Sequence, residues 1–138
     1  MESLRILLVD DHKIVREGLR LLLDQQAHDW QVVGEASGGR SAIALAGTLR
    51  PDVVIMDVSM PGLNGVEATR RIVQAQPAAR VIALSMHVEP SYVATMLAAG
   101  ARGYVNKEAA FDEIVAAIRA VSRNQLFLGE GIEPKEGL

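Results

Sequence analysis

Carboxylates follow two of the short apolar runs in this chain of 138 residues. Asp10 and Asp11 come directly after the run at residues 5–9, and Asp57 comes directly after the run at residues 53–56. If both runs are parallel strands, their carboxyl ends meet at the same rim of a sheet. Like charges at one place repel unless a cation joins them, and Mg²⁺ binds carboxylate oxygens while keeping several waters. The acidic residues therefore predict a site for a hard cation.

A hydroxyl and an amine come at the ends of two further apolar runs. Ser85 follows the fourth run and Lys107 follows the fifth, so both side chains are expected at the rim that holds the acidic residues. A carboxylate nucleophile, a metal, a hydroxyl and a lysine form a set suited to phosphoryl transfer, with Asp57 attacking phosphorus in line. Gly62 and Gly65 would let the loop after Asp57 turn tightly.

The elements that must position these side chains can be read from the hydrophobic pattern. Apolar runs predict five strands; they cover residues 5–9, 31–36, 53–56, 80–84 and 103–106. The first, third and fourth runs are apolar at nearly every position, which is typical of parallel strands buried on both faces. The second and fifth runs are more mixed and are expected at the edges of the sheet.

Segments of helical period separate the strands. They predict five helices at roughly residues 12–25, 39–49, 64–75, 90–99 and 110–124. Strict alternation of strand and helix indicates an α/β fold with right-handed crossovers. We expect a doubly wound (βα)5 parallel sheet with strand order 2-1-3-4-5, in which sites lie where the order reverses, between strands one and three.

Composition narrows the class of protein further. The formal net charge is −3, which gives no strong field for nucleic acid or a membrane surface. The chain has no cysteine and shows neither a signal peptide nor an apolar run long enough to span a membrane. We expect one soluble cytoplasmic domain at residues 1–125. Residues 126–138, with "GEGIEPKEGL", are expected to be a linker or tail with little packing.

Four motifs, in order, resemble the receiver domain of two-component response regulators across residues 4–125. They are the acidic pair "DD", then "MDVSMPGLNG", "ALS" and "GYVNK", each at the carboxyl end of an expected strand. The resemblance implies a CheY-like fold and a signalling domain that a partner histidine kinase phosphorylates. Such a domain catalyses its own phosphorylation and dephosphorylation but turns over no independent substrate.

The resemblance also implies a role for each site residue. Asp57 would be the phosphoacceptor, and it would bind Mg²⁺ together with Asp10, Asp11 and the backbone carbonyl of Ser59.

Three further residues would respond to the phosphoryl group. Lys107 would pair with it, Ser85 would be the switch hydroxyl, and Tyr104 would be the aromatic residue whose burial changes. Many receivers have proline after the lysine, where this chain has Glu108, so no cis bond is predicted there. Met86 is bulkier than the residue often found after the switch hydroxyl, and we hypothesise that it narrows access to the phosphoryl group.

The opening of the first helix, "DDHKIVREGLRLLL", resembles the NarL/FixJ (LuxR-type) branch. The resemblance implies a regulator of transcription that forms a homodimer when phosphorylated. DNA would be bound only through a helix-turn-helix domain beyond this chain, and no membrane contact is implied. A stand-alone receiver is the alternative.

Other classes fit the motifs less well. A haloacid-dehalogenase-type phosphatase has a second aspartate two residues after its nucleophile, where this chain has Ser59. A flavin or nucleotide site favours a glycine-rich loop after the first strand, and a cobalamin module needs glycine where Val15 stands. His12, His28 and His87 are scattered, so we expect none of them to bind a metal, and we expect His12 near the carboxylate cluster but outside it.

Overall fold

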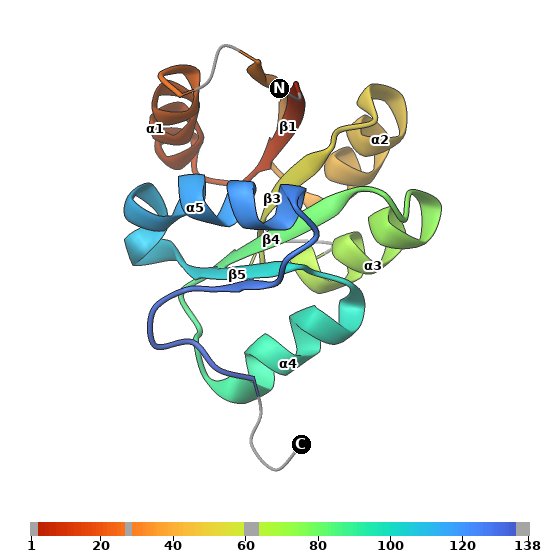
Figure 1. Ribbon diagram of the computed structural model, residues 1–138. Coiled ribbons are helices and arrows are strands. Elements are labelled where there is room, and N and C mark those ends of the chain that lie inside the picture. Colours follow the sequence, from red (N-terminus) through yellow and green to blue (C-terminus); the bar gives the residue numbers. More distant parts are fainter. Residues whose placement is uncertain (1–2, 27–28, 60–63, 135–138) are drawn as a thin grey trace.

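The computed structural model describes residues 3–26, 29–59 and 64–134 (Figure 1). Its centre is one parallel sheet in the order β2-β1-β3-β4-β5-β6. The strands are β1 (Leu4–Val9), β2 (Trp30–Ala36), β3 (Val53–Asp57), β4 (Arg80–Ser85), β5 (Gly103–Asn106) and β6 (Phe127–Leu128). The expected order 2-1-3-4-5 is confirmed, and a sixth strand extends it.

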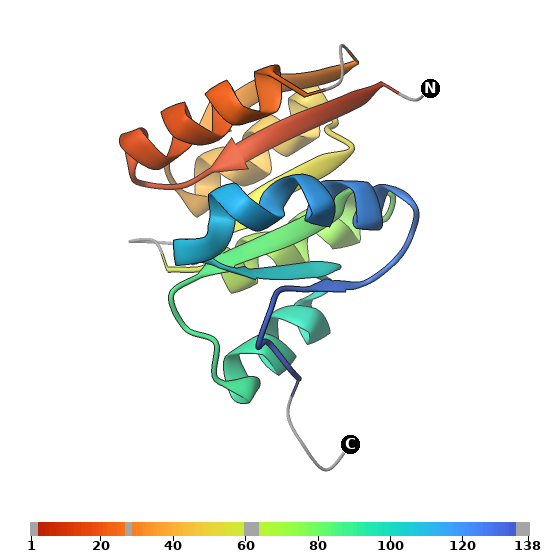
Figure 2. The ribbon, with the colours of Figure 1, turned by 60° about the vertical axis from the view of Figure 1, so that its left-hand side comes forward.

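Among the described residues, five helices cover the two faces of the sheet. They are α1 (Lys13–Asp24), α2 (Gly39–Leu49), α3 (Gly65–Ala75), α4 (Pro90–Ala99) and α5 (Ala110–Ser122), with a short 3₁₀ helix at Lys107–Ala109. Helices α1 and α5 lie on one face, and α2, α3 and α4 lie on the other (Figures 1 and 2). Buried side chains line both faces of β3, as expected of a parallel strand between two helical layers. In the part of the chain that the structure describes, no helix is long and apolar enough to cross a membrane.

Strand register brings the acidic residues to one rim. Val9, the last residue of β1, pairs with Met56, so Asp10 and Asp57 both follow this pair at the carboxyl edge of the sheet. On the other side of β3, Asp57 pairs with Leu84, and Ser85 comes next. The site residues therefore share an edge because four adjacent parallel strands end at the same level.

Two local features shape the approach to that edge. The side chain of Asn64 caps α3 by accepting a hydrogen bond from the backbone N–H of Glu67, at 3.0 Å. At the next residue, Gly65, a Cβ atom would lie 2.8 Å from the Cα of Val58, so glycine allows α3 to start against the end of β3. Gly62 lies outside the described residues.

The C-terminal segment corrects one prediction. We expected little packing after residue 125, but β6 pairs with β5, so β5 is not an edge strand. The backbone N–H of Gly129 donates to the carbonyl of Tyr104 at 2.9 Å, and the Ile132 side chain is buried in the cluster that contains Met96. A short apolar run at residues 126–128 and the single side chain of Ile132 suffice here because the free edge of β5 supplies the hydrogen bonds.

Candidate functional site

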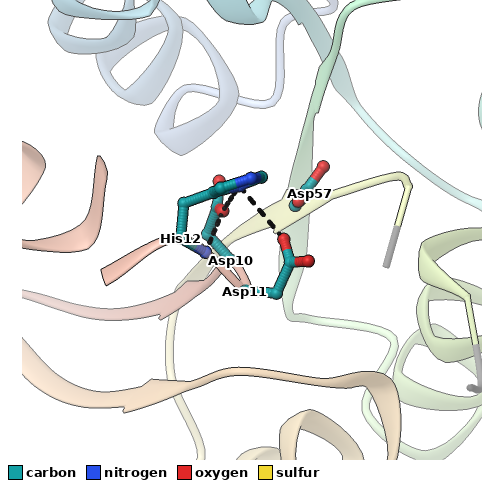
Figure 3. Close-up of side chains that lie close together, drawn as sticks. All are labelled: Asp10, Asp11, His12 and Asp57. Carbon is teal, nitrogen blue, oxygen red and sulfur yellow. Dashed lines mark hydrogen bonds and ion pairs between the residues drawn. The ribbon is translucent and has the colours of Figure 1, made fainter. Parts of the chain in front are cut away.

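Carboxylates from β1 and β3 converge at the rim of the sheet (Figure 3). Asp10, Asp11, His12 and Asp57 each offer a ligand atom, and these atoms lie within 4.8 Å of one another. Asp10 and Asp57 are each only 2% exposed, whereas Asp11 stands at the open side of the cluster. The site therefore has buried acidic walls and an accessible mouth.

Lys107 supplies the positive charge at this site. Its Nζ lies 3.2 Å from Oδ2 of Asp57 and 3.0 Å from Oδ2 of Asp10. Burial alone would lower the pKa of the Lys107 ammonium, but hydrogen bonds and charge attraction from the two aspartates outweigh burial and raise that pKa. Lys107 is therefore held protonated against Asp57.

Asp57 is an unusual carboxyl group. Burial, reinforced by the negative charge of Asp10, raises its pKa to about 6, although Lys107 pulls in the opposite direction. The backbone N–H of Ser59 donates to Oδ1 of Asp57 at 3.2 Å. One amine cannot balance this group of carboxylates, so Asp57 is held in a site that favours a further cation.

The position of His12 corrects our expectation that it stands outside the cluster. Its Nδ1 lies 3.0 Å from Oδ1 of Asp10 and 3.1 Å from Oδ1 of Asp11 (Figure 3). The backbone N–H of His12 also donates to Oδ1 of Asp10 at 2.8 Å. An aspartate that bonds the N–H two residues ahead makes a local turn, and this turn folds the imidazole back over the carboxylates.

The donor set fits a divalent metal ion. Oδ2 of Asp10 is buried and makes no hydrogen bond, although Lys107 lies within ion-pair distance of it. Because Lys107 shares its one positive charge between Asp10 and Asp57, this buried oxygen is only partly compensated, and a further cation would complete its coordination. Carboxylate oxygens with room for waters are the environment that Mg²⁺ favours. The acidic cluster (Asp10, Asp11 and Asp57) is thus suited to hold such an ion.

Ser85 and Tyr104 both bond the backbone of one residue, His87. The N–H of His87 donates to Oγ of Ser85 at 2.9 Å, and the Tyr104 hydroxyl donates to the carbonyl of His87. Ser85 is 1% exposed and Tyr104 is fully buried. Burial raises the pKa of the Tyr104 hydroxyl, and the Ser85 hydroxyl offsets part of that rise. The His87 ring in turn stacks on Tyr92 of α4, with 4.7 Å between the ring centroids.

The sequence alone did not single out His87 as a link between the two residues. Its position two residues after Ser85 was the available signal, because a serine hydroxyl can accept from the N–H two residues ahead. Met86 is exposed and lines a pocket of about 350 Å³, together with Val15 and Lys107. The peptide bond between Lys107 and Glu108 is trans.

Comparison with known proteins identifies the class that this fold and site define. The model of the response regulator receiver domain family matches residues 6–119. The chain therefore belongs to the response regulator receiver domains of two-component systems, and its relatives place it in the NarL/LuxR-type branch.

Individual relatives agree with this assignment. The response regulator UvrY of Escherichia coli (strain K12) is 42% identical over 135 residues, which cover 98% of this chain and 62% of UvrY. A crystal structure of a LuxR-family two-component response regulator from Aurantimonas sp. SI85-9A1 is 40% identical, with a TM-score of 0.89 over 95% of this chain and 93% of that one. A structure of the RcsB response regulator from Salmonella typhimurium, which addresses its conformational dynamism for DNA interaction, is 29% identical with a TM-score of 0.85 over 94% of this chain and 65% of RcsB. This chain thus spans less than two thirds of UvrY.

Proposed function

We propose that Asp57 accepts a phosphoryl group from a partner histidine kinase in a Mg²⁺-dependent reaction. The observation that carries this proposal is the convergence of Asp57, Asp10 and Lys107 at the carboxyl rim of β1, β3 and β5, where Lys107 lies within ion-pair distance of both aspartates. No structural role requires two buried carboxylates to face each other, and their repulsion disfavours the folded state.

The transfer step uses the chain's own carboxylate. An oxygen of Asp57 attacks phosphorus, a new bond forms between that oxygen and phosphorus, and the bond from phosphorus to the donor nitrogen breaks. Lys107, whose Nζ is 3.2 Å from Oδ2 of Asp57, is close enough to neutralise charge on the phosphoryl oxygens. Mg²⁺, when bound, would supply further positive charge to these oxygens; Asp10, Asp11, Asp57 and the Ser59 carbonyl would hold it.

Phosphorylation then alters the loop between β4 and α4. We infer that Ser85 turns toward the phosphoryl group and gives up its contact with the His87 N–H. Tyr104 bonds the carbonyl of His87, so Ser85 and Tyr104 together hold this loop. Loss of the Ser85 contact would remove one of these two contacts and loosen the loop. The signal would thus pass to α4 through one shared residue, with the two conformations differing in which groups Ser85 bonds.

The output belongs to a larger protein. The UvrY relative is longer than this chain, and the RcsB neighbour is described in connection with DNA. We propose that the natural protein is a cytoplasmic transcription regulator. It would form a homodimer when phosphorylated and bind DNA through a domain outside residues 1–138. The receiver would include β6 and the buried Ile132 in addition to residues 1–125, and the connection to the DNA-binding domain would follow them.

Acetyl phosphate tests the proposal directly. Incubation with acetyl phosphate and Mg²⁺, followed by intact-mass measurement, is expected to show one phosphoryl adduct that hydroxylamine removes. The adduct should be absent when EDTA removes the metal and in Asp57→Asn. Asp52→Asn is a matched control, because Asp52 lies before β3, at the opposite end of that strand from Asp57. An adduct that persists in Asp57→Asn contradicts the assignment, and sustained turnover of a small phosphoester would favour a phosphatase instead.

A further inference from the structure

Arg16 connects α1 to the backbone of the acidic cluster. Its Nη1 donates to the carbonyl oxygen of Asp10 at 2.6 Å, and its Nε donates to Oε1 of Glu35 at 2.9 Å. The Arg16 side chain is only 16% exposed. The guanidinium therefore spans the gap between the end of β1 and the end of β2, with each contact made by a different nitrogen.

Glu35 fixes the orientation of this guanidinium. Its second oxygen, Oε2, accepts from Nε of Arg20 at 2.8 Å, so both carboxylate oxygens have cationic partners. Burial by itself would raise the pKa of Glu35, but the hydrogen bonds and charges of Arg20 and Arg16 outweigh burial and lower it. Glu35 thus remains ionised, and its charge offsets that of Arg16 beside the cation-binding carboxylates.

The backbone of Asp10 is consequently held at both its N–H and its carbonyl. The N–H of Asp10 donates to the carbonyl of Ala36 in β2 at 3.0 Å, and the carbonyl of Asp10 accepts from Arg16. These contacts matter because β1 has already ended at Val9 and no sheet partner holds the Asp10 carbonyl. The direction in which the Asp10 and Asp11 carboxylates leave the backbone depends on how the Asp10 backbone is held.

We propose that Arg16, oriented by Glu35, is a positioning residue for the cation site. It sets the geometry of the Asp10–Asp11 ligand pair without touching the ion. This inference rests on the proposed function, since it assumes that the acidic cluster holds Mg²⁺. Loss of a residue that orients metal ligands typically lowers metal affinity by roughly 10–100-fold.

The sign of the effect separates positioning from simple electrostatics. Arg16 is a positive charge near a cation site, so its removal would tighten Mg²⁺ binding if charge alone mattered. If Arg16 instead positions the metal ligands, its removal should weaken Mg²⁺ binding. Arg20 is a matched control because it pairs with the same glutamate but makes no described contact with the Asp10 backbone.

The experiment measures the Mg²⁺ dissociation constant of the whole chain by isothermal titration calorimetry. Arg16→Gln is expected to raise that constant about 10-fold or more. Arg20→Gln is expected to change it by less than about twofold, or to lower it slightly. Arg16→Lys should recover part of the affinity, because an ammonium can still bond the carbonyl of Asp10. This variant also serves if Arg16→Gln does not fold.

Phosphorylation gives a second readout. With acetyl phosphate, Arg16→Gln should need more Mg²⁺ for half-maximal adduct formation yet reach the wild-type extent at saturating Mg²⁺. Equal Mg²⁺ affinities in Arg16→Gln and Arg20→Gln, or tighter binding in Arg16→Gln, would overturn the inference while leaving the proposed function standing. Failure of the wild-type chain to bind Mg²⁺ would instead remove both.

Discussion

Replacement of Asp57 by asparagine should stabilise the metal-free protein at neutral pH. The Asp57 carboxyl is buried beside Asp10, and its pKa rises from 3.8 to about 6. Each pKa unit corresponds to about 1.4 kcal/mol, so ionisation of Asp57 disfavours the folded state by at most about 3 kcal/mol. Solvent at the open mouth of the site screens part of this, and we expect a net gain of about 1–2 kcal/mol in the free energy of unfolding of Asp57→Asn.

The gain must depend on pH with a definite sign. Below about pH 3 the carboxyl is largely neutral in both the folded and the unfolded chain, so the aspartate carries almost no penalty. As the pH rises through 3.8 and on to about 6, the unfolded chain ionises first, and the wild-type protein loses stability over that window. Above that window the difference in stability between Asp57→Asn and the wild-type protein is constant. Asp57→Asn lacks this titration, so its advantage should grow from acidic to neutral pH and then level off.

Urea unfolding in EDTA measures this difference. Trp30 is the only tryptophan and is buried, so its fluorescence reports unfolding. Asp24→Asn is the matched control, because Asp24 is exposed at the end of α1, and its effect should stay below about 1 kcal/mol. The reasoning is refuted if Asp57→Asn is less stable than the wild type at about pH 7.5, or if its advantage is equally large at about pH 4. Saturating Mg²⁺ should narrow the advantage, because bound metal stabilises the wild-type carboxylate.

Three other changes have expected outcomes. Lys107→Gln should bind Mg²⁺ more tightly by calorimetry, because the amine that competes with the metal for Asp10 and Asp57 is gone. The same variant should form its acetyl phosphate adduct more slowly, because it lacks the charge that neutralises the phosphoryl oxygens. Weaker Mg²⁺ binding would contradict this prediction. Ile132→Asn should lower the free energy of unfolding by about 2–4 kcal/mol and remove hydrogen-exchange protection at the Gly129 amide, whereas unchanged protection would show that β6 holds without this side chain. Gly65→Ala should destabilise the protein by about 1–3 kcal/mol, since the new methyl group meets the backbone of β3; a neutral effect in urea unfolding would mean that the backbone shifts freely.

The strands and helices that form the frame could be predicted because burial on both faces leaves a plain signal. The run at residues 53–56 has apolar side chains throughout, and the structure places it as β3, between β1 and β4. Once the order of parallel strands is known, the register of their ends follows, and with it the meeting of Asp10 with Asp57. The acidic part of the site could therefore be predicted from the local hydrophobic pattern and the order of the strands.

The remaining contacts depend on geometry that no local pattern encodes. Strand β6 has two residues, and its hydrogen bonds come from the edge of β5, so the segment shows no strand signal of its own. The return of the His12 ring to the carboxylates depends on the turn after β1. Arg16 lies on α1 and Glu35 lies on β2, so their pairing can be predicted only when the relative position of these two elements is known.

The charge balance at the rim explains why its parts depend on one another. With Asp57 ionised, three carboxylates face one ammonium, Lys107, which leaves about two negative charges to be neutralised. A divalent cation would remove that excess, whereas a second lysine would remove only half of it. Conversion of Asp57 to an acyl phosphate would eliminate its own negative charge but add about two on the phosphoryl group, so the need for the cation would increase on phosphorylation. Glu35 pairs with Arg16 and offsets part of its charge, so Arg16 can hold the Asp10 backbone while its guanidinium is bonded away from the carboxylates of the cluster. The excess negative charge makes the site less stable without a metal than with one, and this difference favours binding of the cation on which phosphorylation would depend.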